Sequence, residues 1–417
     1  GIHRDVRMKR WAIEGINIIT PNGFIENGNI SLNNKKIEKI SKRKIDSNIS
    51  IEIDGILSPG LINSHDHLLG TYYPKVGVGP YQNWLPWDND LKSSPIYEER
   101  QQIENSDLYF LGAYRNLVSG VTTVSDHIPH FVGDPFYDIL PMKAIKDFSM
   151  AHSIASFALA WGEGVQIEYE KSKKHGIPFI THIAEGFDNE TINDLATLKK
   201  QNGLGKYSVL IHGIAFSELD MTDIKKAGAS VVWCCDSNYY MFETTTNIKM
   251  LLDKGINVAI GTDSPMSGGL NLLYEAKFDK AYYEKRYEEE LPDEVIYKMI
   301  TENGAKALWQ HDIGFIKEGY TADLVVFKDK GGSPENSIIN AELRDVQLVV
   351  INGKPVYGDA IYSSLFNELK VKHQHITLDG VEKIIIGDVV GLLKRISRAV
   401  GFKKNFPFLP VEFSIKD

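Results

Sequence analysis

Two histidines, His65 and His67, stand one residue apart at the end of the apolar segment 57–64. If this segment is a strand, its side chains alternate between two faces, so both imidazoles point the same way. Two imidazoles on one face can chelate one metal ion. Such a pair also occurs among ordinary loop histidines, so the interpretation depends on what the rest of the chain places beside it.

Three more polar residues follow short apolar runs further along the chain: His182, His212 and Asp263. In a β/α barrel the carboxyl ends of the strands meet at one face, so these side chains would converge with the first pair. Three imidazoles and a carboxylate with room for water describe a catalytic divalent-metal site rather than a closed structural one. Glu185, three residues after His182, would stand at the rim as a proton carrier.

These positions require a particular α/β fold. Residues 58–319 alternate apolar strands with amphipathic helical stretches, which predicts a (β/α)8 TIM-type barrel. Runs of β-branched residues broken by turn signals at 8–57 and 320–375 predict antiparallel strands in one small domain built from both ends of the chain. A fourth barrel strand is expected at 154–161.

The remaining segment, 376–417, is expected to form a C-terminal amphipathic helix and a tail. Its apolar residues recur at helical spacing opposite a basic face. The helix can pack on the barrel or on a second copy of the chain, and the basic face also allows contact with a membrane surface. The apolar positions are Ile386, Val389, Val390, Leu393, Ile396 and Val400, and the basic ones are Lys394, Arg395 and Arg398.

The ordered set of motifs resembles the amidohydrolase superfamily, and within it the mononuclear aminohydrolase branch. That branch includes the triazine hydrolases and the S-adenosylhomocysteine, methylthioadenosine and guanine deaminases. The resemblance covers residues 13–359. Its carriers are the segments 59–67, 119–123, 181–185, 211–213, 237–238, 261–264, 302–308 and 319–326. The resemblance implies that the domain built from 8–57 and 320–375 is a small β-sandwich. Fewer residues separate 119–123 from His182 than in relatives, so the third β/α unit, within 130–149, is expected to be compressed.

The resemblance implies that His65, His67, His182 and Asp263 hold one divalent metal ion, Zn²⁺ or alternatively Fe²⁺. The ion would lower the pKa of bound water, and Asp263 would take the proton. Hydroxide would then attack a ring carbon of a nitrogen heterocycle while Glu185 protonates the adjacent ring nitrogen. His212 would stabilise the developing oxyanion or hold the hydroxide in line.

The implied reaction is hydrolytic deamination of an aminopurine, a nucleoside or a triazine-like ring. Two alternatives stay open. One is hydrolysis of another C–N bond or of a C–Cl bond on such a heterocycle. The other is a non-catalytic scaffold protein on the amidohydrolase fold, although such proteins have lost metal ligands that this chain retains.

The predicted substrate-binding residues are Trp84, His127 and Asn238. Trp84 can stack on a flat ring or pack its own loop, and Asn238 can contact substrate or shape the loop around it. His127, together with His130, can line the pocket or belong to a surface turn. Glu163 follows the expected fourth strand and would allow a second metal ion, whereas the lack of a strand-end lysine at that position favours one.

The composition of the chain indicates which kinds of binding partner and which cellular compartment to expect. The 417 residues include 46 basic and 55 acidic ones, a formal charge of −9, which argues against a nucleic-acid-binding surface. The two cysteines, Cys234 and Cys235, are adjacent and fit buried strand residues in a reducing compartment. With no apolar run long enough to span a bilayer and no signal-peptide pattern, we expect a cytoplasmic enzyme that acts on a small molecule. A homo-oligomer is compatible with the sequence.

Overall fold

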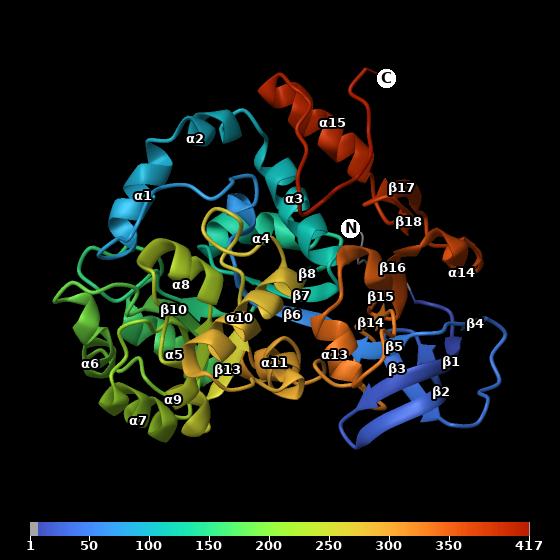
Figure 1. The fold of residues 1–417 in the computed structure, drawn as a ribbon, viewed down its shortest axis with the longest axis horizontal. Coiled ribbons are helices and arrows are strands. Elements are labelled where there is room, and N and C mark those ends of the chain that lie inside the picture. The colour runs from blue at the N-terminus through green and yellow to red at the C-terminus, as the bar shows by residue number, and fades with distance from the viewer. Residues whose placement is uncertain (1–6, 417) are drawn as a thin grey trace.

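Strands from both ends of the chain join in one ten-stranded sheet (Figure 1). The computed structural model describes residues 7–416. The order of the sheet is β17-β18-β16-β15-β14-β5-β1-β2-β3, and β4 pairs with β1. Its strands are β1 (Trp11–Thr20), β2 (Gly23–Asn33), β3 (Lys36–Ser41), β4 (Ser50–Glu52), β5 (Ile56–Pro59), β14 (Leu324–Phe327), β15 (Val346–Ile351), β16 (Lys354–Asp359), β17 (Gln374–Leu378) and β18 (Val381–Ile385).

The middle of the chain forms two parallel sheets, one three-stranded in the order β6-β7-β8 and one five-stranded in the order β13-β12-β11-β10-β9. These strands are almost wholly buried, as expected where both faces of a parallel sheet are covered. They are β6 (Leu61–Asp66), β7 (Val121–Asp126), β8 (Lys143–Ala144), β9 (Ser149–Met150), β10 (Phe179–Ile183), β11 (Ser208–His212), β12 (Ser230–Trp233) and β13 (Asn257–Ile260).

Helices connect the parallel strands and surround them in Figure 1. Their ends follow local chemistry. The helix α7, for example, starts at a reciprocal capping box between Ser217 and Asp220 and ends at Gly228, whose φ of 74° favours glycine. The helices are α1 (Trp84–Lys92), α2 (Pro95–Arg100), α3 (Asn105–Leu117), α4 (His130–Tyr137), α5 (Val165–His175), α6 (Asp194–Lys200), α7 (Glu218–Ala227), α8 (Cys235–Phe242), α9 (Ile248–Asp253), α10 (Leu272–Tyr287), α11 (Asp293–Met299), α12 (Glu302–Ala307), α13 (Pro334–Ile339), α14 (Ser363–Glu368) and α15 (Val389–Val400), with short 3₁₀ turns η1 (Leu68–Gly70), η2 (Thr191–Asn193), η3 (Leu343–Asp345) and η4 (Ala360–Tyr362).

The two parallel sheets meet along β6 and the end of β13. The backbone N–H of Asp263 donates to the carbonyl of His65 at 3.0 Å. The N–H of Thr262 donates to the side-chain oxygen of Asn63 at 3.2 Å, and the Asn63 amide donates to the Thr262 hydroxyl at 2.9 Å. Two ends that are far apart in the sequence are therefore fixed side by side.

The prediction of a fourth strand at 154–161 is wrong. The fourth parallel strand is β9, which pairs Ser149 with Phe179 and Met150 with Ile180, and 154–161 is an irregular segment. No helix lies between β8 and β9 in the described part of the chain, in agreement with the expected compression of the third unit. The strand was missed because two paired residues leave no periodic pattern to detect.

The C-terminal segment folds back onto its own chain. The helix α15 packs on α3, buries Leu392 and Ile396, and pairs Arg395 with Asp107 at 3.0 Å. The expected amphipathic helix is present, but the hairpin of β17 and β18 precedes it where only helix and tail are expected. Among residues 7–416, no helix combines the length and apolar character needed to cross a bilayer.

Candidate active site

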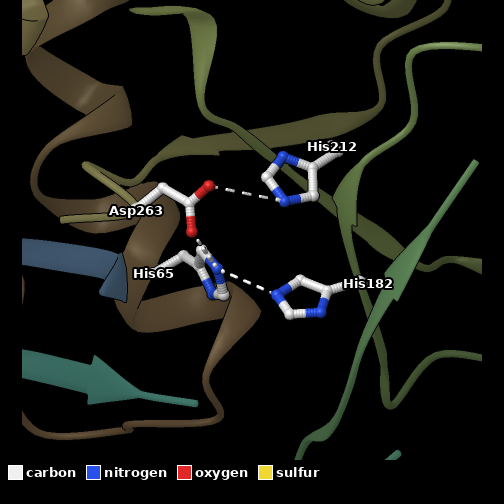
Figure 2. A group of neighbouring side chains, drawn as sticks. All are labelled: His65, His182, His212 and Asp263. Atoms are coloured by element: carbon white, nitrogen blue, oxygen red, sulfur yellow. Dashed lines mark hydrogen bonds and ion pairs between the residues drawn. The ribbon is translucent and has the colours of Figure 1, made fainter. Parts of the chain in front are cut away.

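Four buried side chains from the carboxyl ends of the parallel strands converge on one point (Figure 2). They are His65, His182, His212 and Asp263, and one ligand atom from each lies within 4.8 Å of the others. His65 Nε2 is 3.0 Å from Asp263 Oδ1 and 3.3 Å from His182 Nε2. His212 Nε2 is 3.7 Å from Asp263 Oδ2. Side chains separated by up to about half the chain thus face a common centre.

The other two residues predicted for the centre lie at its edge. His67 Nε2 is 3.2 Å from Asp263 Oδ1, so both histidines of the first pair contact the same carboxylate oxygen. Glu185 Oε2 is 3.2 Å from His212 Nε2, and the side chain is buried. The structure therefore brings together all six side chains that strand-end reasoning predicted.

The backbone bends sharply where these side chains leave their strands. His212, Asp263 and Ser264 have φ values of 84°, 60° and 83°, and Ala184, beside Glu185, has 51°. Non-glycine residues rarely adopt this left-handed region, and such residues cluster at functional sites where the surrounding structure holds them. Here the bends bring His212 and Asp263 towards one another from the ends of β11 and β13, two strands that are separated in the sheet by β12.

A buried ion pair between Asp66 and Arg115 holds the segment that carries His65 and His67. Asp66, between them in the sequence, accepts hydrogen bonds from the guanidinium of Arg115 at 2.8 Å and from the amide of Asn116 at 3.0 Å. The His67 ring nitrogen Nδ1 lies 3.0 Å from the carbonyl oxygen of His127. Because a carbonyl only accepts, Nδ1 carries the proton, which leaves Nε2 unprotonated toward Asp263.

A chain of hydrogen bonds determines the tautomer of His212. The indole N–H of Trp233 only donates, and it bonds the Thr245 hydroxyl at 3.0 Å. That hydroxyl donates to Asn238 Oδ1 at 2.9 Å, so the Asn238 amide donates to His212 Nδ1, also at 2.9 Å. His212 Nδ1 is therefore an acceptor, and the proton of the neutral ring sits on Nε2, facing Glu185 and Asp263.

Burial sets the charge of the centre. It lowers the pKa of His65 and His182, and brings that of His212 to about 3, because a desolvated imidazole resists protonation. Burial alone would raise the pKa of Asp263, but its contacts with His65 and His67 hold it well below its usual range. Burial also acts to lower the pKa of His67, but the Asp263 carboxylate outweighs it and raises that pKa. The centre therefore holds a carboxylate beside three imidazoles that resist protonation and one that gains a proton more readily.

Two carboxyl groups in the centre titrate in opposite directions. Burial, and then the nearby charge of Asp263, raise the pKa of Glu185 well above its ordinary value. Glu185 therefore keeps a proton at pH values where Asp263 has lost its own. A pair of carboxyl groups whose environments separate their pKa values is the usual arrangement for one proton donor and one anion.

The spacing of the donor atoms fits a divalent cation. Two imidazole nitrogens bound to one tetrahedral zinc ion lie about 3.3 Å apart, since each Zn–N bond is about 2.0–2.1 Å long. The Nε2 atoms of His65 and His182 are 3.3 Å apart. Imidazole and carboxylate donors suit zinc and related transition metals better than calcium or magnesium.

The predicted substrate-binding residues lie in different places. Trp84 is buried, with its ring centroid 4.5 Å from that of His152, and its indole N–H has no partner among residues 7–416. Asn238 contacts His212 and not open space. His127 is fully buried beside His182, with 4.5 Å between ring centroids.

Two other candidates lie outside the centre. His130 is on α4 and bonds Asp134 and the carbonyl of Phe148. Glu163 is largely exposed and pairs with Lys171 at 2.6 Å, so it is not placed to support a second metal ion. Both cysteines are buried, and burial raises their thiol pKa well above the ordinary value, as expected for structural residues.

Sequence reasoning missed His152 and Ser237. His152 follows β9, its ring centroid lies 5.1 Å from that of His182, and the rings of Trp84 and Trp161 pack against it at 4.5 and 4.6 Å. The sequence signal was a histidine two residues after β9, but the fourth strand was expected at 154–161, so His152 was not recognised as a residue at a strand end. Ser237, which donates to Asp263 Oδ2 at 2.8 Å, lies within a recognised motif but had no side-chain role assigned.

The chain is similar in sequence to known proteins. Residues 163–356 match the amidohydrolase family. The chain is 26% identical to the 5-methylthioadenosine/S-adenosylhomocysteine deaminase of Pyrococcus furiosus, an alignment that covers 85% of this chain and 94% of the relative.

Solved structures share the fold. The atrazine chlorohydrolase of Arthrobacter aurescens TC1, in complex with zinc, superposes with a TM-score of 0.72 at 19% identity and covers 83% of this chain and 95% of its own. The guanine deaminase of C. acetobutylicum with bound guanine gives a TM-score of 0.64 at 17% identity, over 83% of this chain and all of its own (100%).

Proposed function

We propose that this chain, whose residues 163–356 match the amidohydrolase family, is a metal-dependent hydrolase that deaminates a nitrogen heterocycle such as an aminopurine, a nucleoside or an aminotriazine. The observation that carries the proposal is the convergence of buried imidazoles on the Asp263 carboxylate, with the buried carboxyl of Glu185 beside them. A metal site and a separate proton donor are the two parts that this hydrolysis needs.

We assign His65, His67, His182 and Asp263 as the metal ligands. The unprotonated Nε2 of His67 and the 3.3 Å spacing of His65 and His182 support this set. His212 is left out, although it belongs to the tight cluster, because its Nε2 carries a proton. A bound Zn²⁺, or alternatively Fe²⁺, would supply hydroxide at neutral pH by lowering the pKa of coordinated water.

The remaining side chains move or hold protons. Glu185 keeps a proton and can deliver it to a ring nitrogen next to the carbon under attack. Asp263 presents Oδ2, which accepts from Ser237, as the oxygen that takes up a proton during the attack. The Nε2–H of His212 points at both carboxyl groups and can donate to a developing oxyanion between them.

An aromatic surface beside the ligands suits a flat ring. Trp84, His152 and Trp161 pack edge to face next to His182, and stacking or edge contacts with such side chains orient planar substrates. We propose that Trp84 contacts the substrate, with its unpartnered indole N–H available as a donor. Asn238 acts through His212 as a positioning residue.

The printed names of the relatives narrow the substrate class and define the alternative. Relatives and structural neighbours are named as deaminases of methylthioadenosine, S-adenosylhomocysteine and guanine, and one neighbour as an atrazine chlorohydrolase. We therefore expect ammonia as the leaving group, with another C–N bond or a C–Cl bond as the second candidate. The complete set of predicted ligands argues against a non-catalytic scaffold.

We further propose that the two parallel sheets are parts of one (β/α)8 barrel spanning 58–319. The two sheets together contain eight strands in chain order, β6 to β8 and β9 to β13, which supports this proposal. The backbone hydrogen bond from Asp263, just after β13, to His65 in β6 also supports it, because it joins the last strand to the first. In this view 8–57 and 320–375 form a β-sandwich domain. A cytoplasmic location and a homo-oligomeric state stay predictions.

The experiment is a substrate panel. Zinc-loaded protein and chelator-stripped protein are incubated with aminopurines, aminopyrimidines, adenosyl thioethers, aminotriazines and chlorotriazines, and both ammonia and chloride are measured. The proposal expects ammonia from one compound class, only with metal. Chloride without ammonia would establish the alternative leaving group, and no product with metal bound would contradict the proposed substrate class.

A further inference from the structure

His127 is a buried histidine with no role in the reaction described above. It follows β7, its side chain is fully buried, and its ring Nδ1 lies 3.3 Å from His182 Nε2. We propose that His127 is an additional metal ligand, which binds the same ion as His65, His67, His182 and Asp263 through Nδ1. This inference rests on the proposed metal site and adds a fourth imidazole to it.

The hydrogen bonds of His127 leave Nδ1 as a lone-pair donor. The ring Nε2 lies 2.9 Å from the backbone carbonyl of Ala151, which can only accept, so Nε2 carries the proton. In the neutral ring, which has a single N–H, Nδ1 is therefore the unprotonated nitrogen. An unprotonated nitrogen whose opposite nitrogen donates to a carbonyl is the usual state of a histidine ligand.

The distances place that lone pair in the same array of donors. His127 Nδ1, His182 Nε2 and His65 Nε2 follow one another at 3.3 Å, and His65 Nε2 is 3.0 Å from Asp263 Oδ1. The value of 3.3 Å is long for a charge-free N–H···N hydrogen bond but equals the separation of about 3.3 Å between nitrogens that share a tetrahedral zinc ion. Both spacings around His182 therefore have one explanation.

A direct hydrogen bond from His182 to His127, without a metal ion, would explain only one of the two 3.3 Å contacts of His182. His182 Nε2 can carry one hydrogen, yet it has a ring nitrogen at 3.3 Å on either side, so that hydrogen can serve at most one of the two contacts. Contact with substrate is also disfavoured, because His127 has no exposed surface and Trp161 lies across it, with ring centroids 5.4 Å apart.

His127 also forms backbone hydrogen bonds with the segment that carries His65 and His67. Its carbonyl accepts from His67 Nδ1 at 3.0 Å, and its backbone N–H donates to the carbonyl of Asp66 at 3.1 Å. One residue thus fixes the tautomer of His67 through its backbone and binds the metal through its ring. A fourth imidazole would donate more electron density to the ion.

The test is NMR of histidine-labelled protein, in which NMR-active nitrogen and cadmium isotopes report direct bonds through scalar coupling. The assigned ligands His65, His67 and His182 bind through Nε2, so a coupling between cadmium and an Nδ1 atom identifies His127. We expect one cadmium resonance coupled to three Nε2 atoms and one Nδ1 atom. The Nδ1 coupling should disappear in His127→Gln and persist in His130→Gln, the matched control three residues further on.

The wild-type spectrum decides the question even where a variant folds poorly. One bound cadmium ion with Nε2 couplings alone would overturn the role of His127 and leave the proposed function intact. A second cadmium resonance carrying the Nδ1 coupling would also overturn it, since His127 would then bind a different ion. Failure to bind cadmium at all would overturn the proposed function together with this inference.

Discussion

Asn238 donates a hydrogen bond to His212, with 2.9 Å between the amide nitrogen and Nδ1, and so determines which nitrogen of the ring carries its proton. The direction of this bond follows from Trp233, which can only donate and starts the chain through Thr245. The proton of His212 thereby faces the two carboxyl groups of the centre. This distinguishes His212, whose ring donates to oxygen, from the rings that we propose as metal ligands.

Replacing Asn238 with leucine tests this relationship. The variant keeps the volume but removes the donor to His212 Nδ1, so both tautomers become accessible and turnover should fall about 10–100-fold, the usual effect of losing a residue that orients an active-site ring. Nitrogen chemical shifts of His212 should change from one tautomer to a mixture, while zinc content stays the same. An unchanged tautomer would show that Asn238 does not fix the ring.

Replacing Glu185 with glutamine tests the proton donor. Glutamine keeps the shape and the contact with His212 but cannot release a proton, so turnover should fall by about 10²–10⁴-fold with metal content and fold intact. Glu218→Gln, on the exposed surface of α7, is the matched control and should keep wild-type activity. Activity that survives in Glu185→Gln would show that another group delivers the proton.

Two substitutions of Asp263 separate its roles. Asp263→Ala removes an oxygen that lies 3.0 Å from His65 and 3.2 Å from His67, so both zinc affinity and turnover should fall. Asp263→Asn keeps a neutral oxygen ligand but accepts a proton poorly, so its turnover should fall more than its zinc affinity. Competition with a chromogenic chelator measures the affinity. Unchanged zinc binding in Asp263→Ala would leave Asp263 as a base alone.

A buried carboxyl away from the centre should make stability depend on pH. Burial raises the pKa of Glu275 to about 8, above the ordinary value of 4.5, so the folded state holds a proton that the unfolded chain has released. Its contribution is fully favourable below the unfolded pKa, and stability is lost as pH rises from there through the folded pKa of about 8.

Glu275→Gln should remove that loss, because the amide carries no charge and can still accept from the Asp236 N–H. Urea unfolding of metal-loaded protein should show the variant more stable than wild type by roughly 2–5 kcal/mol at alkaline pH, with the difference vanishing in acid. Glu284→Gln on the same helix, where Glu284 pairs with Lys280 near the surface, should show the wild-type pH profile. A variant with an unaltered profile would contradict the buried-proton account.

Much of the site could be predicted from the sequence because parallel strands impose simple geometry. His65, His182 and His212 each end an apolar run, and strands that run in parallel bring their ends to one face. Asp263 follows the same rule, one bend after β13. The helix of 389–400 was also predictable, since its apolar spacing is set by the α-helical repeat alone.

The parts that were missed depend on tertiary contacts. The strand β9 has only two residues and is defined by pairing with β10, so His152 was not recognised as a strand-end residue. The hairpin of β17 and β18 extends a sheet whose other strands lie mostly at the opposite end of the chain. The protonation of His212 is fixed by Asn238 through contacts that no local pattern contains.

The most direct test of the central claim is a zinc titration of metal-stripped protein in which bound zinc and ammonia release are measured on the same samples. The account predicts that ammonia release rises in proportion to bound zinc, reaches its plateau at one zinc ion per chain, and stays at background in the stripped protein. Full ammonia release from stripped protein, or a plateau that needs two zinc ions, would contradict a single-metal site built on His65, His67, His182 and Asp263.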